Sequence, residues 1–182
     1  MKNYLLRMKA SGKCPPRKPT SKIFWSWLGA FFGIYLVALL TEYFGLLSSS
    51  GVFIFGSFGA SAVLIYGAPM ADFSQPRNLV GGHVISALIG VFVYMSFGQA
   101  SSLACAIAVS LAIVAMHFTR TLHPPGGATA LIAVTGGERI HALGYHYAFL
   151  PIMMGAVIML LVALCVNNLS GNPQRHYPVY WY

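Results

Sequence analysis

The sequence predicts an all-α membrane protein, a polytopic helix bundle of about six apolar segments arranged as a 3+3 inverted repeat with two short broken helices. Three observations predict this fold. Of the 182 residues, 57% are hydrophobic and only 8% are charged, whereas about 25% are charged in soluble domains. Long apolar runs alternate with short polar loops, and one short motif occurs twice. Because a crossing takes about 20 residues, the length excludes a transporter of ten or more spans.

The chain begins with a basic arm over residues 1–22. Seven of the 11 lysines and arginines lie in this arm, and a basic segment ahead of a span holds the N-terminus in the cytoplasm. We prefer this explanation to nucleic-acid binding, so no nucleic acid partner is expected. The apolar run from Ile23 to Thr41 is too long for the core of a signal peptide. It predicts a first transmembrane helix over about residues 23–46.

Five further apolar segments predict the rest of the bundle. They cover about residues 51–67, 78–97, 103–118, 125–134 and 147–166. Short polar loops separate these segments, and the aromatic side chains near the C-terminus suit the headgroup region of a bilayer. We therefore expect a single transmembrane domain over residues 23–167, followed by a cytoplasmic aromatic tail over residues 168–182.

A six-residue motif occurs twice, 68 residues apart. The two copies are Gly59-Ala60-Ser61-Ala62-Val63-Leu64 and Gly127-Ala128-Thr129-Ala130-Leu131-Ile132. Each copy lies in the middle one of three apolar segments, so the chain divides into the halves 23–97 and 103–166. Because each half crosses the membrane three times, an odd number, the second half is inserted upside down relative to the first, as in many transporters.

Charge placement favours six crossings over four. With the N-terminus inside, six crossings place Arg77, Arg120 and Arg175 on the cytoplasmic side, as the positive-inside rule prefers. If the two middle segments re-enter on the same side, only four segments cross, and Arg77, Arg120 and Arg139 lie outside. Both arrangements stay open at this point.

The segment at 125–134 is too short to cross the hydrocarbon. About ten residues rise about 15 Å as a helix, against a hydrocarbon core of about 30 Å. We expect a half-helix in which Pro124 or Pro125 occupies the first turn, while Gly126 and Gly127 allow close backbone approach. Segment 51–67 is expected to be broken at the matching place. Free amides at the two helix starts would then converge near the midplane and hold an anion.

Several motifs resemble one family of membrane proteins. The signature of the HPP family is similar to His123-Pro124-Pro125-Gly126-Gly127-Ala128-Thr129-Ala130. The other motif blocks of that family resemble, in the same order, Phe58-Gly59-Ala60-Ser61-Ala62, Gln75-Pro76-Arg77-Asn78 and Gly81-Gly82-His83. The resemblance covers about residues 24–167. It implies a transporter, generally described with four spans, and its plastid and cyanobacterial relatives are linked to nitrite uptake.

Candidate substrate-binding residues come from the motif blocks of both halves. They are His123, Pro124, Pro125, Gly126, Gly127, Thr129, Gly59, Ser61, His83 and Asn78. A histidine can donate a hydrogen bond to an anion or carry a proton near neutral pH, and Ser61 and Thr129 occupy equivalent repeat positions. The competing explanations are a capping or interfacial role for His123, a packed or snorkelling side chain near the interface for His83, and packing of small residues between helices for Ser61 and Thr129.

Three charged residues are further candidates. Arg77 and Arg120 are candidates for an electropositive vestibule that attracts anions, although anchoring of the topology on the cytoplasmic side is the preferred explanation for them. Glu42, the only acid within the first apolar segment, is a candidate for ion coupling. Its place near the outer end of that segment also fits a residue at the membrane interface.

Other classes of function are disfavoured. His83, His117 and His123 lack a cysteine or carboxylate at zinc-like spacing, so we expect no metal and no cofactor. The sequence contains no enzyme motif, and we expect no enzyme. The sequence favours a transporter or channel for a small inorganic anion such as nitrite. We expect the protein to form a homodimer or homotrimer and to lie among the lipids of a bacterial inner membrane. The alternative is a non-transporting scaffold or subunit that binds a protein or lipid partner.

Overall fold

The computed structural model describes residues 2–10, 12–45 and 52–182, and every regular element in these ranges is helical. The elements are α1 (Lys2–Arg7), α2 (Thr20–Tyr43), α3 (Val52–Gly67), η1 (Asp72–Ser74), α4 (Pro76–Phe97), α5 (Ser102–Phe118), α6 (Pro125–Thr135), α7 (Glu138–Leu143), η2 (Ala148–Met153), α8 (Met154–Leu169) and η3 (Pro173–Arg175). The all-α class predicted from the sequence is confirmed.

Three stretches of the described residues are long and apolar enough to cross a membrane, namely α2, α4 and η2 with α8, which is kinked at Leu150. Residues 56–67 of α3, together with α5 and α6, form shorter apolar helices. All six apolar segments therefore fall within a few residues of their expected places. Six full crossings, and the inverted repeat built on them, stay predictions because the shorter helices do not meet the length of a span.

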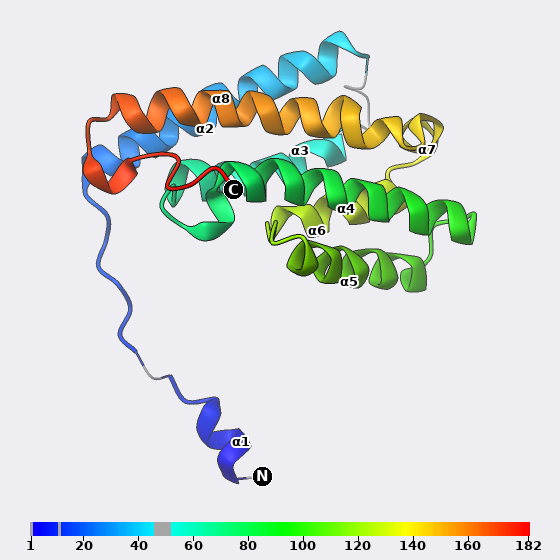
Figure 1. Ribbon diagram of the computed structural model, residues 1–182, viewed down its shortest axis with the longest axis horizontal. Helices are drawn as coiled ribbons and strands as arrows, with labels where there is room; N and C mark the ends of the chain where they lie inside the picture. Colours follow the sequence, from blue (N-terminus) through cyan, green and yellow to red (C-terminus); the bar gives the residue numbers. More distant parts are fainter. Residues whose placement is uncertain (1, 11, 46–51) are drawn as a thin grey trace.

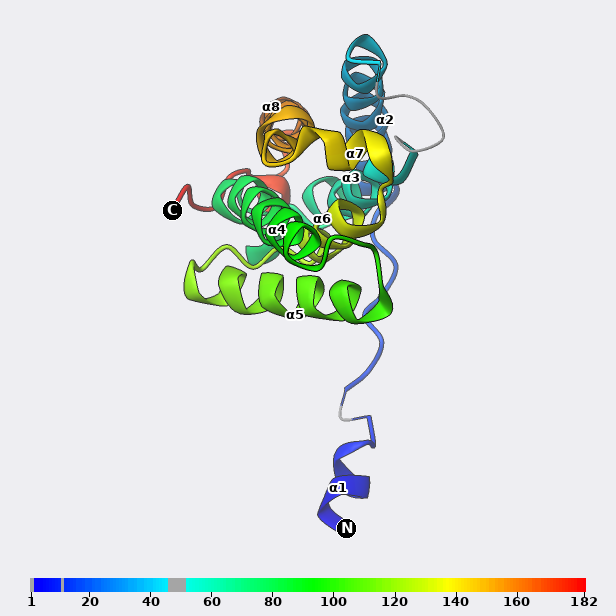
Figure 2. The same ribbon diagram turned by 90° about the vertical axis from the view of Figure 1, so that its right-hand side faces the viewer.

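The helices stack in layers around α4. Helices α2 and α8 pack together on one side, α3, α4 and α6 lie in the middle, and α5 covers the opposite face (Figures 1 and 2). Helix α5 approaches α4 and α6 closely because Ala104, Ala108 and Ala112 recur every fourth residue on its buried face. The basic arm leaves the bundle as an extended chain that ends in α1 (Figure 1).

Helices α3 and α6 run in opposite directions. The imidazole of His123, just before α6, donates to the carbonyl of Phe73, beyond the end of α3, at 2.6 Å. At the other end, Arg139, beyond α6, donates to the carbonyl of Gly45 at 3.0 Å, on the side where α3 begins. The two helix starts therefore lie at opposite ends of the pair, and the expectation that they converge is wrong.

The expected break in the middle segment of the first half is also wrong. Helix α3 is continuous from Val52 to Gly67 and passes through Gly56 and Gly59 without interruption. Gly51, where the expected break begins, lies outside the described residues. The short helix of the second half has the expected form, since α6 begins at Pro125 and ends after 11 residues.

Two polar regions carry more structure than expected. The loop at 135–146 contains the short helix α7. The C-terminal tail packs against the bundle, because Tyr177 is buried and its hydroxyl donates to the carbonyl of Ser74 at 2.8 Å. Trp181 and Tyr182 at its end are exposed, and the place of the tail in the headgroup region stays a prediction.

Candidate functional site

Four fully buried polar side chains meet between α3, α4 and α6. Ser61 of α3 lies with its Oγ 2.7 Å from Nε2 of His83 in α4 and 2.8 Å from Nε2 of His123. On its other side, Nδ1 of His83 lies 2.7 Å from Oγ1 of Thr129 in α6. We call Ser61, His83, His123 and Thr129 the histidine cluster.

The hydrogen bonds of the histidine cluster have one consistent direction. Nδ1 of His123 faces the carbonyl of Phe73, and since a carbonyl only accepts, this nitrogen carries the proton. In a neutral ring Nε2 then accepts, which assigns the Ser61 hydroxyl as its donor at 2.8 Å; the carbonyl of Ser57, at 3.2 Å, is a longer second acceptor for the same hydroxyl. Ser61 accepts from Nε2 of His83, and Nδ1 of His83 accepts from Thr129. The tautomers follow from this network, which runs unbroken from Thr129 to Phe73.

The histidine cluster has no acid to balance a charge. The three acids of the chain, Glu42, Asp72 and Glu138, are all exposed, and none bonds to the cluster. A proton added to either buried ring would therefore create a charge without a partner, which is costly away from water. This favours the neutral form that the hydrogen-bond directions also require.

Equivalent positions of the repeat hold the same imidazole. Ser61 and Thr129 lie 68 residues apart at matching places of the two motif copies, and they bond to the two ring nitrogens of His83. His83 also packs on Phe58, with ring centroids 5.1 Å apart. The two equivalent positions of the repeat thus contact one side chain, that of His83.

Glycines position the histidine cluster by letting α4 approach the start of α6. A Cβ at Gly82 would lie 2.5 Å from Cβ of His123, and one at Gly126 would lie 2.6 Å from Oγ of Ser86. Real Cβ atoms do not come so close, so neither position accepts a side chain without backbone movement. Close approach of the backbone, predicted for Gly126, is what the structure has.

The amides at the start of α6 are not free. Pro124 and Pro125 carry no N–H, while the N–H of Gly126 donates to the carbonyl of His123 at 2.8 Å and that of Gly127 to the carbonyl of Pro124 at 3.0 Å. The predicted anion site of bare amides is therefore wrong. The local turn that begins the helix consumes the donors.

Two predicted glycines lie away from the histidine cluster. A Cβ at Gly59 would meet no atom within 4 Å, and one at Gly127 would meet only Val109, at 3.7 Å. Pro124 is exposed, whereas Pro125 is buried and its carbonyl lies 3.4 Å from Oγ1 of Thr129. Glu42 is exposed near the end of α2, and no bond joins it to the cluster.

Arg77 and Arg120 share one open pocket of about 320 Å³ with Asp72, Tyr180 and Tyr182. Arg77 is fixed there by a 3.0 Å bond to the carbonyl of Thr119, and Arg120 turns the chain with a left-handed φ of 59°. Burial, followed by the charge of Asp72, raises the pKa of Tyr180, while the two arginines oppose this rise. The two arginines line one pocket, as predicted, and an acid lines the same pocket. We call this pocket the arginine vestibule.

The arginine vestibule adjoins the histidine cluster along the chain. Asp72 of the vestibule precedes Phe73, whose carbonyl ends the hydrogen-bonded network. Arg77 likewise precedes Asn78, a buried residue whose amide nitrogen donates to the carbonyl of Leu122 at 2.8 Å. Its Oδ1 is buried and has no hydrogen-bond partner among the described residues. Asn78 therefore offers a spare acceptor between the vestibule and the cluster.

Sequence reasoning missed three contributors. The acceptor from Phe73 is a main-chain atom, which no residue type reveals. Tyr147 is buried and donates to the carbonyl of Thr129 at 3.1 Å, which ties α6 to the start of the last apolar segment. Ser86 is buried against Met116, with 3.5 Å between Oγ and Sδ. Ser86 lies seven residues before Val93 on the buried face of α4 and could have been found by helical spacing.

Comparison with known proteins agrees with the fold and the motifs. Residues 15–178 match the model of the HPP transmembrane region. Two curated transmembrane proteins of Dictyostelium discoideum are similar: one is 47% identical over 98% of this chain and 57% of its own length, the other 46% identical over 93% and 59%. The chain thus spans less than two thirds of these relatives, and no solved structure matches it. Both relatives come from a eukaryote, and the location of this chain in a bacterial inner membrane stays a prediction. The chain belongs to the HPP transmembrane family.

Proposed function

We propose that the protein is a transporter or channel for a small solute, that the solute is a small inorganic anion such as nitrite, and that the histidine cluster handles the anion together with a proton. The observation that carries this proposal is the pair of fully buried imidazoles joined through one hydroxyl, with no carboxylate beside them. A pair that served only to hold helices together would not require two groups that can gain a proton.

The chemistry of the histidine cluster favours joint binding of an anion and a proton. An anion alone would lose its hydration at a neutral site, and a proton alone would leave a buried charge unpaired, so each carries a large cost. When both arrive, imidazolium and anion compensate each other through a charge-assisted hydrogen bond. Nitrite moving with one proton is electrically neutral, which suits a site without fixed charge.

The arginine vestibule supports the same function from outside the histidine cluster. Among the side chains that line it, two guanidinium groups outnumber one carboxylate, and a mouth with an excess of basic side chains raises the local concentration of anions. The pocket is linked to the buried network along the chain, because Phe73, which accepts from His123, follows Asp72. We place the vestibule on the cytoplasmic side, on the positive-inside argument.

A non-transporting scaffold is the second candidate function, and one observation favours it. The backbones of α4 and α6 are in close contact at Gly82 and Gly126, and each ring nitrogen of the histidine cluster already has a partner. A fully satisfied polar network can serve to fix how helices pack, with no solute involved.

Uptake of nitrite into proteoliposomes separates the two functions. We expect the full chain to move nitrite above empty liposomes, and faster when the outside is more acidic than the inside. His83→Gln and His123→Gln should each lower the rate at least tenfold, while His117→Gln, at an exposed position of α5, should keep it. Circular dichroism and gel filtration in detergent show whether each variant is folded.

The outcomes are decisive in both directions. Uptake that is equal in the wild type and in both cluster variants would remove the histidine cluster from the pathway. If the folded wild type moves neither nitrite nor other small anions such as nitrate and formate, the scaffold is the better function.

A further inference from the structure

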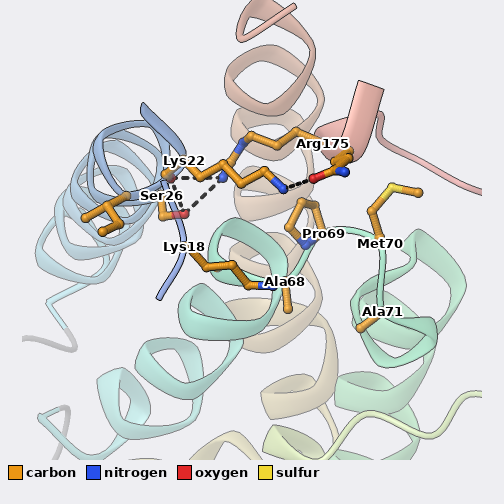
Figure 3. Close-up of a pocket in the computed structure, with 11 residues that line it drawn as sticks. Lys18, Lys22, Ser26, Ala68, Pro69, Met70, Ala71 and Arg175 are labelled. Atoms are coloured by element: carbon orange, nitrogen blue, oxygen red, sulfur yellow. Dashed lines mark hydrogen bonds between the residues drawn. The ribbon is translucent and has the colours of Figure 1, made fainter. Parts of the chain in front are cut away.

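A second pocket, of about 440 Å³, lies where α2, α3 and the C-terminal tail meet, and it is separate from the histidine cluster. The polar side chains that line it are Lys18, Lys22, Ser26, Gln174 and Arg175. Residues 67–71, the end of α3 and the chain that follows it, form the opposite wall. Figure 3 shows the side chain of Lys18 extending toward this wall.

Arg175 is a buried cation without an anionic partner. Only 2% of its surface is exposed. Its Nη1 atom donates to the carbonyl of Lys22 at 3.2 Å and to Oγ of Ser26 at 3.0 Å. Its Nη2 atom donates to the carbonyl of Tyr66 at 2.9 Å and to Oδ1 of Asn167 at 2.6 Å. All four acceptors are neutral. Nε is buried with no partner among the described residues, so one donor of the guanidinium is unused.

Two lysines add to this charge. Nζ of Lys22 donates to Oε1 of Gln174, and Lys18 lines the same pocket (Figure 3). No carboxylate is among the residues that line it, in the part of the chain the structure describes. Glu42 lies at the far end of α2, Asp72 belongs to the arginine vestibule, and Glu138 lies in α7. Three cations therefore line one pocket, and no described residue of the chain supplies a counterion there.

We propose that this pocket binds a phosphate group, which an anionic phospholipid headgroup or free phosphate supplies. A phosphate has several strong acceptor oxygens that can bond to the two ammonium groups at once, while its charge compensates the guanidinium beside them. It would also provide the counterion that Arg175 lacks. Basic pockets between membrane helices are known to hold anionic headgroups.

The surroundings favour the lipid as the source. Ile23 and Met70 give the pocket an apolar part beside the lysines. Trp27 follows on the same end of α2 and is exposed, as is typical of aromatic side chains at the level of headgroups. This site does not depend on transport and holds for either candidate function.

Native mass spectrometry of the full chain in detergent tests the site. We expect one molecule of a short-chain phosphatidylglycerol per chain, bound at least tenfold more tightly than the matching phosphatidylcholine. Lys18→Gln with Lys22→Gln should weaken this binding at least tenfold. The matched control is Lys9→Gln with Lys13→Gln, which removes the same charge from exposed positions of the arm and should change the affinity less than twofold. Arg175 is left intact because it bridges α2, α3 and α8.

Inorganic phosphate distinguishes the two sources. If it displaces the phosphatidylglycerol at similar concentration, the pocket binds the phosphate group itself and free phosphate is its ligand. If displacement needs at least a hundredfold excess, the lipid is the ligand. The proposal is overturned if neither probe binds, if phosphatidylcholine binds equally well, or if the control pair weakens binding as much as Lys18→Gln with Lys22→Gln.

Discussion

Removing one hydroxyl from the centre of the histidine cluster should strongly destabilise the bundle. Ser61→Ala leaves two buried groups without a partner, the Nε2–H of His83 and the Nε2 of His123. Since each such group costs about 1–3 kcal/mol, we expect the free energy of unfolding to fall by about 3 kcal/mol. Thr129→Val keeps the shape of the side chain and strands only Nδ1 of His83, so about half that loss is expected.

The assay is unfolding by sodium dodecyl sulfate in mixed micelles, followed by circular dichroism. Ser110→Ala is the matched control, because Ser110 is an exposed residue of α5 that bonds only to the carbonyl of Ile107 within its own helix. The order of the three losses matters more than their size. If Ser61→Ala costs no more than Ser110→Ala, or less than Thr129→Val, the network does not hold the cluster as described.

Three further predictions follow from other contacts. Gly82→Ala should lower the midpoint of thermal unfolding, because the new Cβ would meet His123 at 2.5 Å and the carbonyl of Thr121 at 2.7 Å. Overpacking of this kind costs about 1–3 kcal/mol. The control Gly59→Ala, whose Cβ would meet no described atom within 4 Å, should leave the midpoint unchanged. Burial raises the pKa of Tyr177 above its ordinary value of 10.0, so the folded form holds this proton longer than the unfolded form. Stability should then be level below pH 10 and fall above it, more steeply in the wild type than in Tyr177→Phe, as measured by unfolding midpoints between pH 8 and 11. Arg77→Gln and Arg120→Gln should raise the KM for nitrite uptake several-fold and leave kcat unchanged. The control Arg139→Gln should change neither constant. A fall in kcat alone would contradict a vestibule that only concentrates anions.

Local features of the fold could be predicted because they depend on neighbouring residues. Apolar runs set the helix ranges, Pro125 set the start of α6, and the repeat indicated that Ser61 and Thr129 belong together. The converging helix starts were wrong for two reasons. The direction of α3 relative to α6 depends on packing across the whole bundle, and the Pro-Pro-Gly-Gly turn satisfies its own amides at Gly126 and Gly127.

Features that depend on distant contacts could not be predicted. In the sequence, Arg175 is an isolated basic residue of a polar tail, which is typical of a solvated charge. Its burial depends on acceptors contributed by Ser26, Tyr66 and Asn167, which are far away along the chain. The role of Phe73 was equally hidden, since only the folded path of the backbone brings its carbonyl to His123.

The carbonyl at the end of the buried network gives the network a polarity. Phe73 can take a hydrogen bond from His123 but can never give one, so the string of donors cannot simply be reversed. A backbone carbonyl is too weak a base to take the proton itself, so a relay cannot run from Thr129 through Phe73 to the arginine vestibule. The string therefore orients both imidazoles in one sense and decides which ring nitrogen of each faces a donor.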